Sequence, residues 1–139
     1  MGWIDFGAVT WWAVAVAFVV SFVFGWFWYS PQGFFPLWRR LDKISSDDME
    51  NANMGIAFGG TAVGNLLGVV LVALLMPALG VEGWLAGLAF GALVGLVFRG
   101  GAHAIHNGFA GRHPGVTLID LAHDTIGLAL AAAVLGAIG

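Results

Sequence analysis

The sequence predicts an all-α protein: an integral membrane four-helix bundle that forms one domain over residues 1–139, with an interfacial segment between helices 1 and 2. Three observations predict this fold class. Hydrophobic residues make up 60% of the chain, and the mean hydropathy is +0.91, which is more apolar surface than a soluble domain of this size can bury. Charged residues are only 9% of the composition. Four apolar segments are each long enough to cross about 30 Å of hydrocarbon as helices.

Composition also excludes several classes of function. The net charge of −3 provides no basic patch for nucleic acid, so we expect no nucleic-acid partner. The absence of cysteine excludes disulfides, thiolate metal sites and a thiol nucleophile. The first residues lack the basic region of a signal peptide. We therefore expect the first hydrophobic segment to remain in the protein as a transmembrane helix.

The four transmembrane helices are expected at residues of about 9–28, 54–79, 84–106 and 116–138. The connection from Leu79 to Gly83 is a tight turn, which predicts that helices 2 and 3 are antiparallel neighbours. The connection from Gly111 to Gly115 contains Pro114 and is a second turn, because proline and glycine end helices. Helices 3 and 4 should therefore also be adjacent.

The first connection is longer and contains the interfacial segment, at about residues 31–45. Its first half, from Phe34 to Leu41, mixes large apolar and basic residues, as segments lying in the membrane interface do. Ser45 and Ser46 then precede several acidic residues, a pattern typical of an N-cap followed by acids in the first helical turn. We expect this cap to begin helix 2 in water, about two turns before the membrane.

The distribution of Lys and Arg predicts the orientation. Basic residues in the first and third connections place these on the cytoplasmic side of the cytoplasmic (inner) membrane, with both termini outside. These residues are Arg39, Arg40, Lys43 and Arg112. Aromatic residues at the same level are expected to anchor the inner interface, as aromatic belts do. These anchors are Trp26, Trp28, Tyr29 and Trp38.

Glycine, with 22 residues, follows a pattern that predicts close helix packing. Helix 2 contains one stripe at four-residue spacing, and helix 3 contains another. They are Gly60, Gly64 and Gly68, and Gly87, Gly91 and Gly95. Each glycine costs about 1 kcal/mol relative to alanine inside a helix, so both stripes should be compensated by packing. We expect one stripe to pack helices 2 and 3 together. Whether the other stripe forms an interface with another subunit stays an open question.

Six ionisable residues form a polar cluster inside otherwise apolar helices. Each half of the cluster occupies one helix face, at spacings of i, i+4, i+7 on helix 3 and i, i+3, i+4 on helix 4. Such groups are costly at membrane depth and usually face a partner, a cavity or a ligand. The cluster consists of Arg99, His103, His106, Asp120, His123 and Asp124.

The short turn between helices 3 and 4 predicts how the cluster is paired. Counting residues from that turn, Arg99 and Asp124 each lie about two helical turns inside, and His103 and Asp120 each lie about one turn inside. We therefore expect one pair at each level. His106 should lie nearer the surface.

Three interpretations of the polar cluster remain open. It is a structural ion-pair network, a metal site or a path for protons or ions. Imidazoles and carboxylates suit zinc, iron or manganese, although the positive charge of Arg99 opposes a cation. Asn65 would add an amide if its helix face turns inward. The candidate metal ligands are His103, His106, His123 and Asp120.

Several short motifs lie at the ends and starts of the predicted helices. Helix 1 ends in Gly25-Trp26-Phe27-Trp28-Tyr29-Ser30-Pro31 and is followed by an aromatic stretch from Phe34 to Trp38. Asn53-Met54-Gly55 begins helix 2, and Asp120 precedes His123 by three residues in helix 4. Together these motifs resemble the bacterial membrane family known as domain of unknown function 1761, and the resemblance covers nearly the whole chain. It implies a small four-helix membrane protein and supplies no activity.

The sequence therefore predicts a non-enzymatic membrane protein, either a homo-oligomer or an accessory subunit of a membrane complex. Its expected partners are the lipid bilayer and either further copies of the chain or another membrane protein. The alternative is a protein that binds a metal or small polar ligand, or relays protons, at the polar cluster. The sequence requires no cofactor.

Overall fold

The computed structural model describes residue 2 and residues 4–139 and is all-α. Four helices are long and apolar enough to cross a membrane: Trp11–Trp28, Met54–Ala78, Trp84–Phe109 and Pro114–Ile138. The chain order is η1 (Phe6–Ala8), α1 (Trp11–Trp28), α2 (Phe35–Leu41), α3 (Ser46–Asn51), α4 (Met54–Ala78), α5 (Trp84–Val94), η2 (Gly95–Gly100), α6 (Gly101–Phe109) and α7 (Pro114–Ile138). The predicted fold class is confirmed, including a short helical segment between helices 1 and 2.

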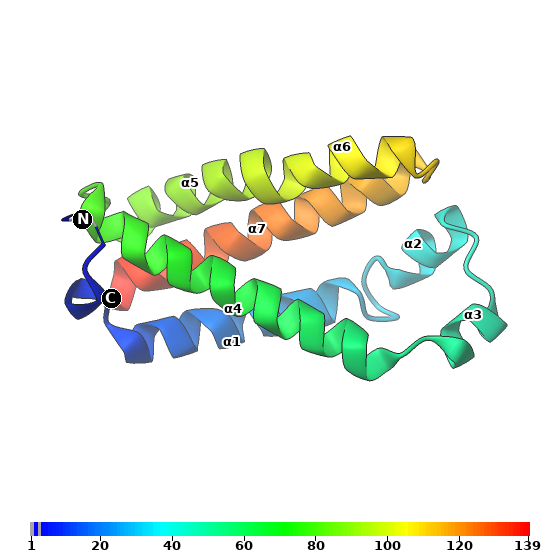
Figure 1. The fold of residues 1–139 in the computed structure, drawn as a ribbon, viewed down its shortest axis with the longest axis horizontal. Coiled ribbons are helices and arrows are strands. Elements are labelled where there is room, and N and C mark those ends of the chain that lie inside the picture. The colour runs from blue at the N-terminus through cyan, green and yellow to red at the C-terminus, as the bar shows by residue number, and fades with distance from the viewer. Residues whose placement is uncertain (1, 3) are drawn as a thin grey trace.

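The two ends of the bundle differ. Both termini lie at one end, close to the turn between α4 and α5 (Figure 1). The opposite end contains α2, α3 and the turn between α6 and α7. All Lys and Arg residues except Arg99 lie in the two connections at this second end.

The third long helix changes its winding where it enters the polar cluster. Regular α-helix in α5 gives way to the π-helical segment η2, and α6 then resumes the α-helical pattern to Phe109. Glycines begin and end the segment, at Gly95 and Gly100, and Arg99 lies within it. Because π-helical turns are rare and are often found at functional sites, this segment makes Arg99 a candidate functional residue.

The glycine stripe of the third helix packs against α7. A Cβ atom at Gly91 would lie 2.5 Å from the carbonyl oxygen of Leu128 and 2.9 Å from the Cα atom of Ala129. A Cβ atom at Gly95 would lie 2.9 Å from the Cα atom of Thr125, and one at Gly87 would meet the Ala132 carbonyl. The expectation that helices 2 and 3 pack through these glycines is therefore wrong. α5 packs along α7, whose alanines allow equally close approach.

The glycine stripe of α4 lies largely open. Nothing lies within 4 Å of a Cβ atom built at Gly60 or Gly64, whereas one at Gly68 would contact the side chains of Arg99 and Leu128. Nearly every residue in the first half of α4 is exposed, and its first buried residue is Asn65. Only the second half of α4 is therefore packed into the bundle.

The hydrophobic core occupies the half of the bundle near the termini. It joins one face of α1, the second half of α4 and the middle and end of α7. Its buried members include Ala13, Val14, Ala17, Val69, Val72, Leu128, Ala131 and Ala132. Small residues dominate this list, which allows the three helices to approach closely. The other half of the bundle contains the polar cluster.

The serines of the first connection begin a separate helix. Ser45 Oγ accepts a hydrogen bond from the Asp48 backbone N–H at 3.1 Å, and the Ser45 N–H donates to the Asp48 carboxylate at 2.8 Å. These two bonds form the capping box of α3. The prediction of an N-cap is confirmed, but α3 ends at Asn51 and a second cap, Asn53, begins α4. The expected extension of helix 2 into water is wrong, because two caps divide it.

Candidate functional site

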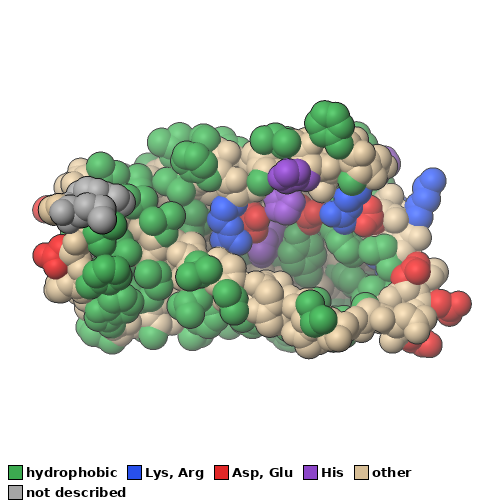
Figure 2. Space-filling model, viewed as in Figure 1, with side chains coloured by type: hydrophobic (Ala, Val, Ile, Leu, Met, Phe, Trp, Pro, Cys, Tyr) green, Lys and Arg blue, Asp and Glu red, His purple; other side chains and the backbone are tan. Residues whose placement is uncertain are grey.

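A cavity of about 580 Å³ lies between α1, α4, α7 and the η2–α6 part of the third helix. Figure 2 shows this hollow on the side of the bundle, where the charged and histidine side chains gather. Five of the six residues of the polar cluster line it: Arg99, His103, Asp120, His123 and Asp124. The volume is within the range typical of small-molecule sites, which is about 300–1,000 Å³.

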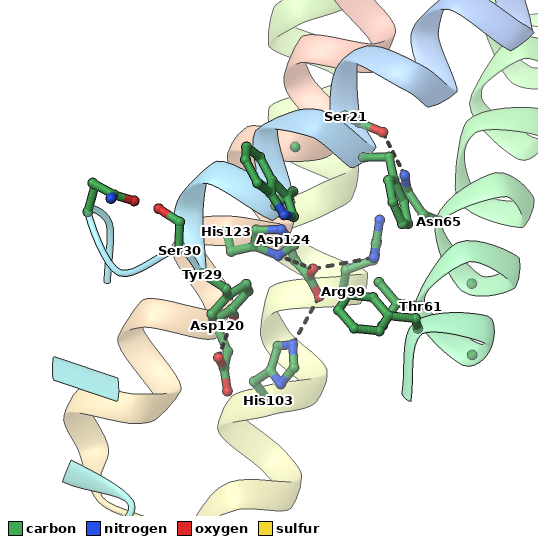
Figure 3. A pocket seen from close by; sticks show the side chains of 18 of the residues that line it. Ser21, Tyr29, Ser30, Thr61, Asn65, Arg99, His103, Asp120, His123 and Asp124 are labelled. Atoms are coloured by element: carbon green, nitrogen blue, oxygen red, sulfur yellow. Dashed lines mark hydrogen bonds and ion pairs between the residues drawn. The ribbon is translucent and has the colours of Figure 1, made fainter. Parts of the chain in front are cut away.

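Asp124 is the centre of the cluster (Figure 3). One carboxylate oxygen, Oδ1, accepts from the Arg99 guanidinium at 3.3 Å and lies 3.0 Å from His123 Nδ1. The other, Oδ2, lies 2.9 Å from His103 Nε2. The side chain of Asp124 is only 14% exposed, and that of Arg99 is 29% exposed. Three groups from two helices therefore converge on one carboxylate.

This arrangement determines the tautomers of the neutral histidines. An ionised carboxylate only accepts hydrogen bonds, so the ring nitrogens that face Asp124 must carry the protons. Neutral His103 is then protonated on Nε2, and neutral His123 on Nδ1. His103 Nδ1 and His123 Nε2 remain as bare acceptors. In its neutral form, each imidazole thus has one protonated nitrogen bonded to Asp124 and one nitrogen without a proton.

His123 is held among aromatic rings. Its ring stacks on Phe24, with centroids 5.8 Å apart and an interplanar angle of 7°, and its centroid lies 5.0 Å from that of Tyr29. Nε2 is buried, with no hydrogen-bond partner among the described residues. A Cβ atom at Gly25 would lie only 2.7 Å from this nitrogen. Glycine at position 25 therefore makes room for the ring.

Asp120 has a separate set of partners. Its Oδ1 accepts from the Tyr29 hydroxyl at 2.6 Å and from Trp38 Nε1 at 2.9 Å, while Oδ2 lies 3.8 Å from an Arg112 nitrogen. Arg112 also donates twice to Asp42, at 3.1 and 2.6 Å, and its guanidinium lies 5.6 Å from the Trp38 ring centroid. These contacts fasten α2 to α7 and to the α6–α7 turn.

The Arg99–Asp124 pair lies near the middle of the long helices. Arg99 is ten residues before Phe109, and Asp124 is ten residues after Pro114. At 1.5 Å per residue, each is about 15 Å from its helix end. The sequence-based prediction placed the pair about two turns inside, but both helices continue further toward the turn. If the helices span a bilayer, the ion pair lies close to its midplane.

Comparison with known proteins identifies the family. A family model described as "Protein of unknown function (DUF1761)" matches residues 12–136. The chain belongs to this family. No curated protein and no solved structure matches it. The matched range covers the residues of the cavity, and the family description assigns no activity to them.

The structure of this DUF1761 member pairs only some of the predicted partners. Arg99 meets Asp124 as expected. The expected pairing of His103 with Asp120 is wrong, because His103 bonds to Asp124 and Asp120 is occupied by Tyr29 and Trp38. His106 is exposed and does not line the cavity.

The proposed metal ligands do not converge. In the part of the chain that the structure describes, no group of three or more His, Asp or Glu side chains is placed to hold a metal ion. The reason is geometric: His106 points away, Asp120 is turned toward α2, and Arg99 occupies the space beside Asp124. The positive charge of Arg99 also disfavours a cation there.

The predicted interface anchors have different surroundings. Trp26 is 69% exposed, as an anchor would be. Tyr29 and Trp38 instead direct their polar atoms to Asp120, and Trp28 packs its ring against Phe34 with centroids 4.4 Å apart. The Trp-Tyr-Ser-Pro motif therefore contributes directly to the site.

Sequence reasoning also missed a polar contact between α1 and α4 in the cavity wall. The Asn65 amide donates to Ser21 Oγ at 2.8 Å, and both residues are buried. The amide of Asn65 does turn inward, but Ser21 gave no signal because its helix face is otherwise apolar. This hydrogen bond joins α1 to α4 beside the cavity, as Figure 3 shows.

Tyr29 should resist ionisation at alkaline pH. It is the only tyrosine in the chain, so tyrosinate absorbance near 295 nm reports on it alone. Burial raises the pKa of Tyr29 above its ordinary value of about 10, and Asp120 adds to the rise. We expect no tyrosinate at pH 10.5 in the folded protein, whereas after unfolding in denaturant Tyr29 should be about half ionised near pH 10 and mostly ionised at pH 10.5.

The same shift predicts how stability depends on pH. Because the folded pKa of Tyr29 is raised, the folded state holds this proton more tightly than the unfolded state. Its contribution to stability is complete below about pH 10 and is lost as the pH rises beyond that value. Tyrosinate appearing at pH 10 without unfolding would show that Tyr29 is not held against Asp120.

Proposed function

We propose that this protein is a multi-pass membrane protein that binds a small ligand in the cavity between α1, α4, α7 and the third helix. The observation that carries the proposal is open space of about 580 Å³ beside an ion pair at the middle of apolar helices. A purely structural ion-pair network is most stable when it is tightly packed and when each of its polar groups has a hydrogen-bond partner. Space beside such a network is explained by a ligand.

The contacts of Arg99 support this proposal. Only one of its guanidinium nitrogens hydrogen bonds to Asp124, at 3.3 Å, which is long for a charge-assisted bond. The guanidinium carries further donors in a fixed plane, and Arg99 lines the cavity. Charged groups inside apolar spans usually mark pathways or ligand sites. The π-helical turn that presents Arg99 fits the same interpretation.

A pair of substitutions in α4 tests the proposal. Gly64 lines the cavity and Gly59 does not, and nothing lies within 4 Å of a Cβ atom at either position. Gly64→Phe should fill the cavity without disturbing the helix, and Gly59→Phe is the matched control. The measurement is native mass spectrometry of each protein, extracted gently from its own membrane.

We expect wild type and Gly59→Phe to retain a small molecule that Gly64→Phe has lost. The proposal fails if all three proteins carry the same bound masses, or if none carries a small molecule. Loss from both variants would mean that an altered α4, rather than a filled cavity, removes the ligand.

The exposed half of α4 favours self-association as a second candidate. Gly59, Gly60 and Gly64 leave a smooth surface that no described residue covers, and such surfaces allow another helix to approach closely. The same native spectra test this candidate. A mass of two or more whole chains that Gly59→Phe reduces to one would support it, whereas a monomer in wild type would exclude it.

We further propose that the end bearing α2 and α3 faces the cytoplasm. Four of the five Lys and Arg residues lie in the connections at that end, and none lies in the turn between α4 and α5. The chain has no cysteine, so single cysteines report cleanly. In intact cells, an impermeant thiol reagent should label Glu82→Cys and leave Ser46→Cys unlabelled. The reverse result would invert the topology.

A further inference from the structure

We infer that the ligand is an uncharged amphipathic lipid, with a carbonyl group in its head, that enters the cavity from the side of the bundle. This inference rests on the proposed function and adds the chemical class of the ligand. Three features carry it: the direction in which the cavity opens, the composition of its wall and the balance of charge inside it.

The cavity opens laterally. α4 leaves the bundle along its first half, where nearly all residues are exposed, and the cavity is lined by this half on one side and by the η2–α6 part of the third helix on the other. Figure 2 shows the hollow on a face parallel to the helix axes. If the helices span a bilayer, that face is in contact with hydrocarbon. A molecule that enters there must dissolve in lipid, which favours an amphipath over a water-soluble metabolite.

One side of the cavity wall is mainly apolar, and the opposite side is polar. Aromatic and glycine residues of α1 and α4 provide an apolar surface, including Phe22, Trp26 and Phe58. The opposite side presents Arg99, His103 and Asp124 from η2, α6 and α7. Thr61 and Asn65 of α4, which Figure 3 shows across the space, are polar, but their donors are already used by the Ala57 carbonyl and by Ser21 Oγ. An apolar chain with one polar head matches this division.

The charge balance selects an uncharged head. With His103 and His123 neutral, the site and its supporting contacts contain two arginines, Arg99 and Arg112, against three aspartates. An anionic head would add to an excess of negative charge in a poorly solvated space, where unpaired charge is expensive. A cationic head would lie beside Arg99. It would also find both carboxylates in the cavity already occupied by hydrogen-bond donors.

The remaining hydrogen-bond capacity selects a carbonyl. Arg99 retains donors that no described residue uses, and these need an acceptor. Asp124, by contrast, already accepts from three groups. A carbonyl oxygen is the neutral acceptor that would complete the guanidinium without disturbing its pair. His103 Nδ1, bare in the neutral tautomer, could accept from an N–H or O–H on the same head.

A series of head groups on one chain tests the inference. The probes are oleamide, oleyl sulfate and oleylamine, which share an 18-carbon chain and carry neutral, anionic and cationic heads. Butyramide supplies the amide head without the long chain. Each is titrated into purified full-length protein in detergent, and bound adducts are counted by native mass spectrometry. Wild type is compared with Gly64→Phe, Gly59→Phe and Arg99→Gln.

We expect oleamide to bind wild type and Gly59→Phe at least about tenfold more tightly than either charged lipid, because an unpaired charge in a poorly solvated cavity costs roughly this factor or more. Gly64→Phe should bind none of the probes in the cavity. Arg99→Gln should weaken oleamide binding, because it replaces a charged donor with a neutral one, and should reduce the preference for oleamide over oleylamine, because it leaves the site more negative.

The outcomes separate the two proposals. Tighter binding of the sulfate or the amine, still abolished by Gly64→Phe, overturns the uncharged head and leaves the cavity as a ligand site. Butyramide binding as tightly as oleamide overturns lateral entry of a lipid. If Gly64→Phe changes the binding of no probe while a native small molecule is lost from it, the lipid class is wrong. If Gly64→Phe changes nothing in either experiment, the proposed function fails as well.

Discussion

Replacing Gly91 with leucine should destabilise the protein by about 3 kcal/mol or more, the largest effect that we expect from a single substitution. The first atom added at Gly91 would meet the Leu128 carbonyl oxygen at 2.5 Å, the Ala132 Cβ at 2.6 Å and the Ala129 Cα at 2.9 Å. These neighbours are backbone or Cβ atoms of α7, so no rotation of a side chain relieves the overlap. α5 must separate from α7.

The measurement is the midpoint of unfolding in detergent, followed by circular dichroism during heating or during titration with a denaturing detergent. Gly59→Leu is the matched control, because it makes the same change in an apolar helix where nothing lies within 4 Å. The control should change stability by about 1 kcal/mol or less, and in the stabilising direction, because glycine is a poor helix former. Equal losses in the two variants would contradict the packing of α5 on α7.

Removing one partner of the Arg99–Asp124 pair should be the second largest effect. Arg99→Ala leaves a largely buried carboxylate without its full charge partner, which typically costs 3–5 kcal/mol in a dry interior. Because the Arg99 side chain is 29% exposed, we expect a loss somewhat below this range, about 2–3 kcal/mol. Asp124→Asn should cost a similar amount, since it weakens the interactions with Arg99, His103 and His123 together.

The double variant distinguishes a true pair from two independent residues. Arg99→Ala combined with Asp124→Asn should destabilise by about 1–2 kcal/mol less than the sum of the single changes, because the second substitution removes the charge that the first one strands. The free energies of unfolding of all four proteins form the cycle. Additive losses would show that the 3.3 Å contact contributes nothing to stability.

The helices could be predicted because the forces that determine them are local. Apolar runs gave all four spans to within a few residues, and Gly80, Gly83, Gly111 and Pro114 marked the turns. The packing of α5 could not be predicted in the same way. A glycine stripe shows that some helix approaches closely, but the sequence does not contain the identity of that helix. Here the alanines of α7 provided the complementary surface.

The candidate site, like the fold, could be predicted only in part from the sequence. The spacing of Arg99, His103, His123 and Asp124 placed them on facing sides of two helices joined by a short turn, so their convergence could be predicted. The partners of Asp120 could not, because Tyr29 and Trp38 lie 91 and 82 positions away in the chain. The cavity was also unpredictable, since it results from where α4 leaves the bundle.

The ion pair at mid-length also bears on how the protein enters the membrane. A single Arg or Asp at the centre of a span raises the free energy of insertion by about 2.5–3.5 kcal/mol. Arg99 and Asp124 lie on consecutive long helices that meet at a short turn. The smallest unit in which both charges are neutralised is therefore this hairpin, and we expect it to leave the translocation channel as one piece. A chain truncated after α6 should consequently insert its third helix poorly, as reporter sites placed at its end would show.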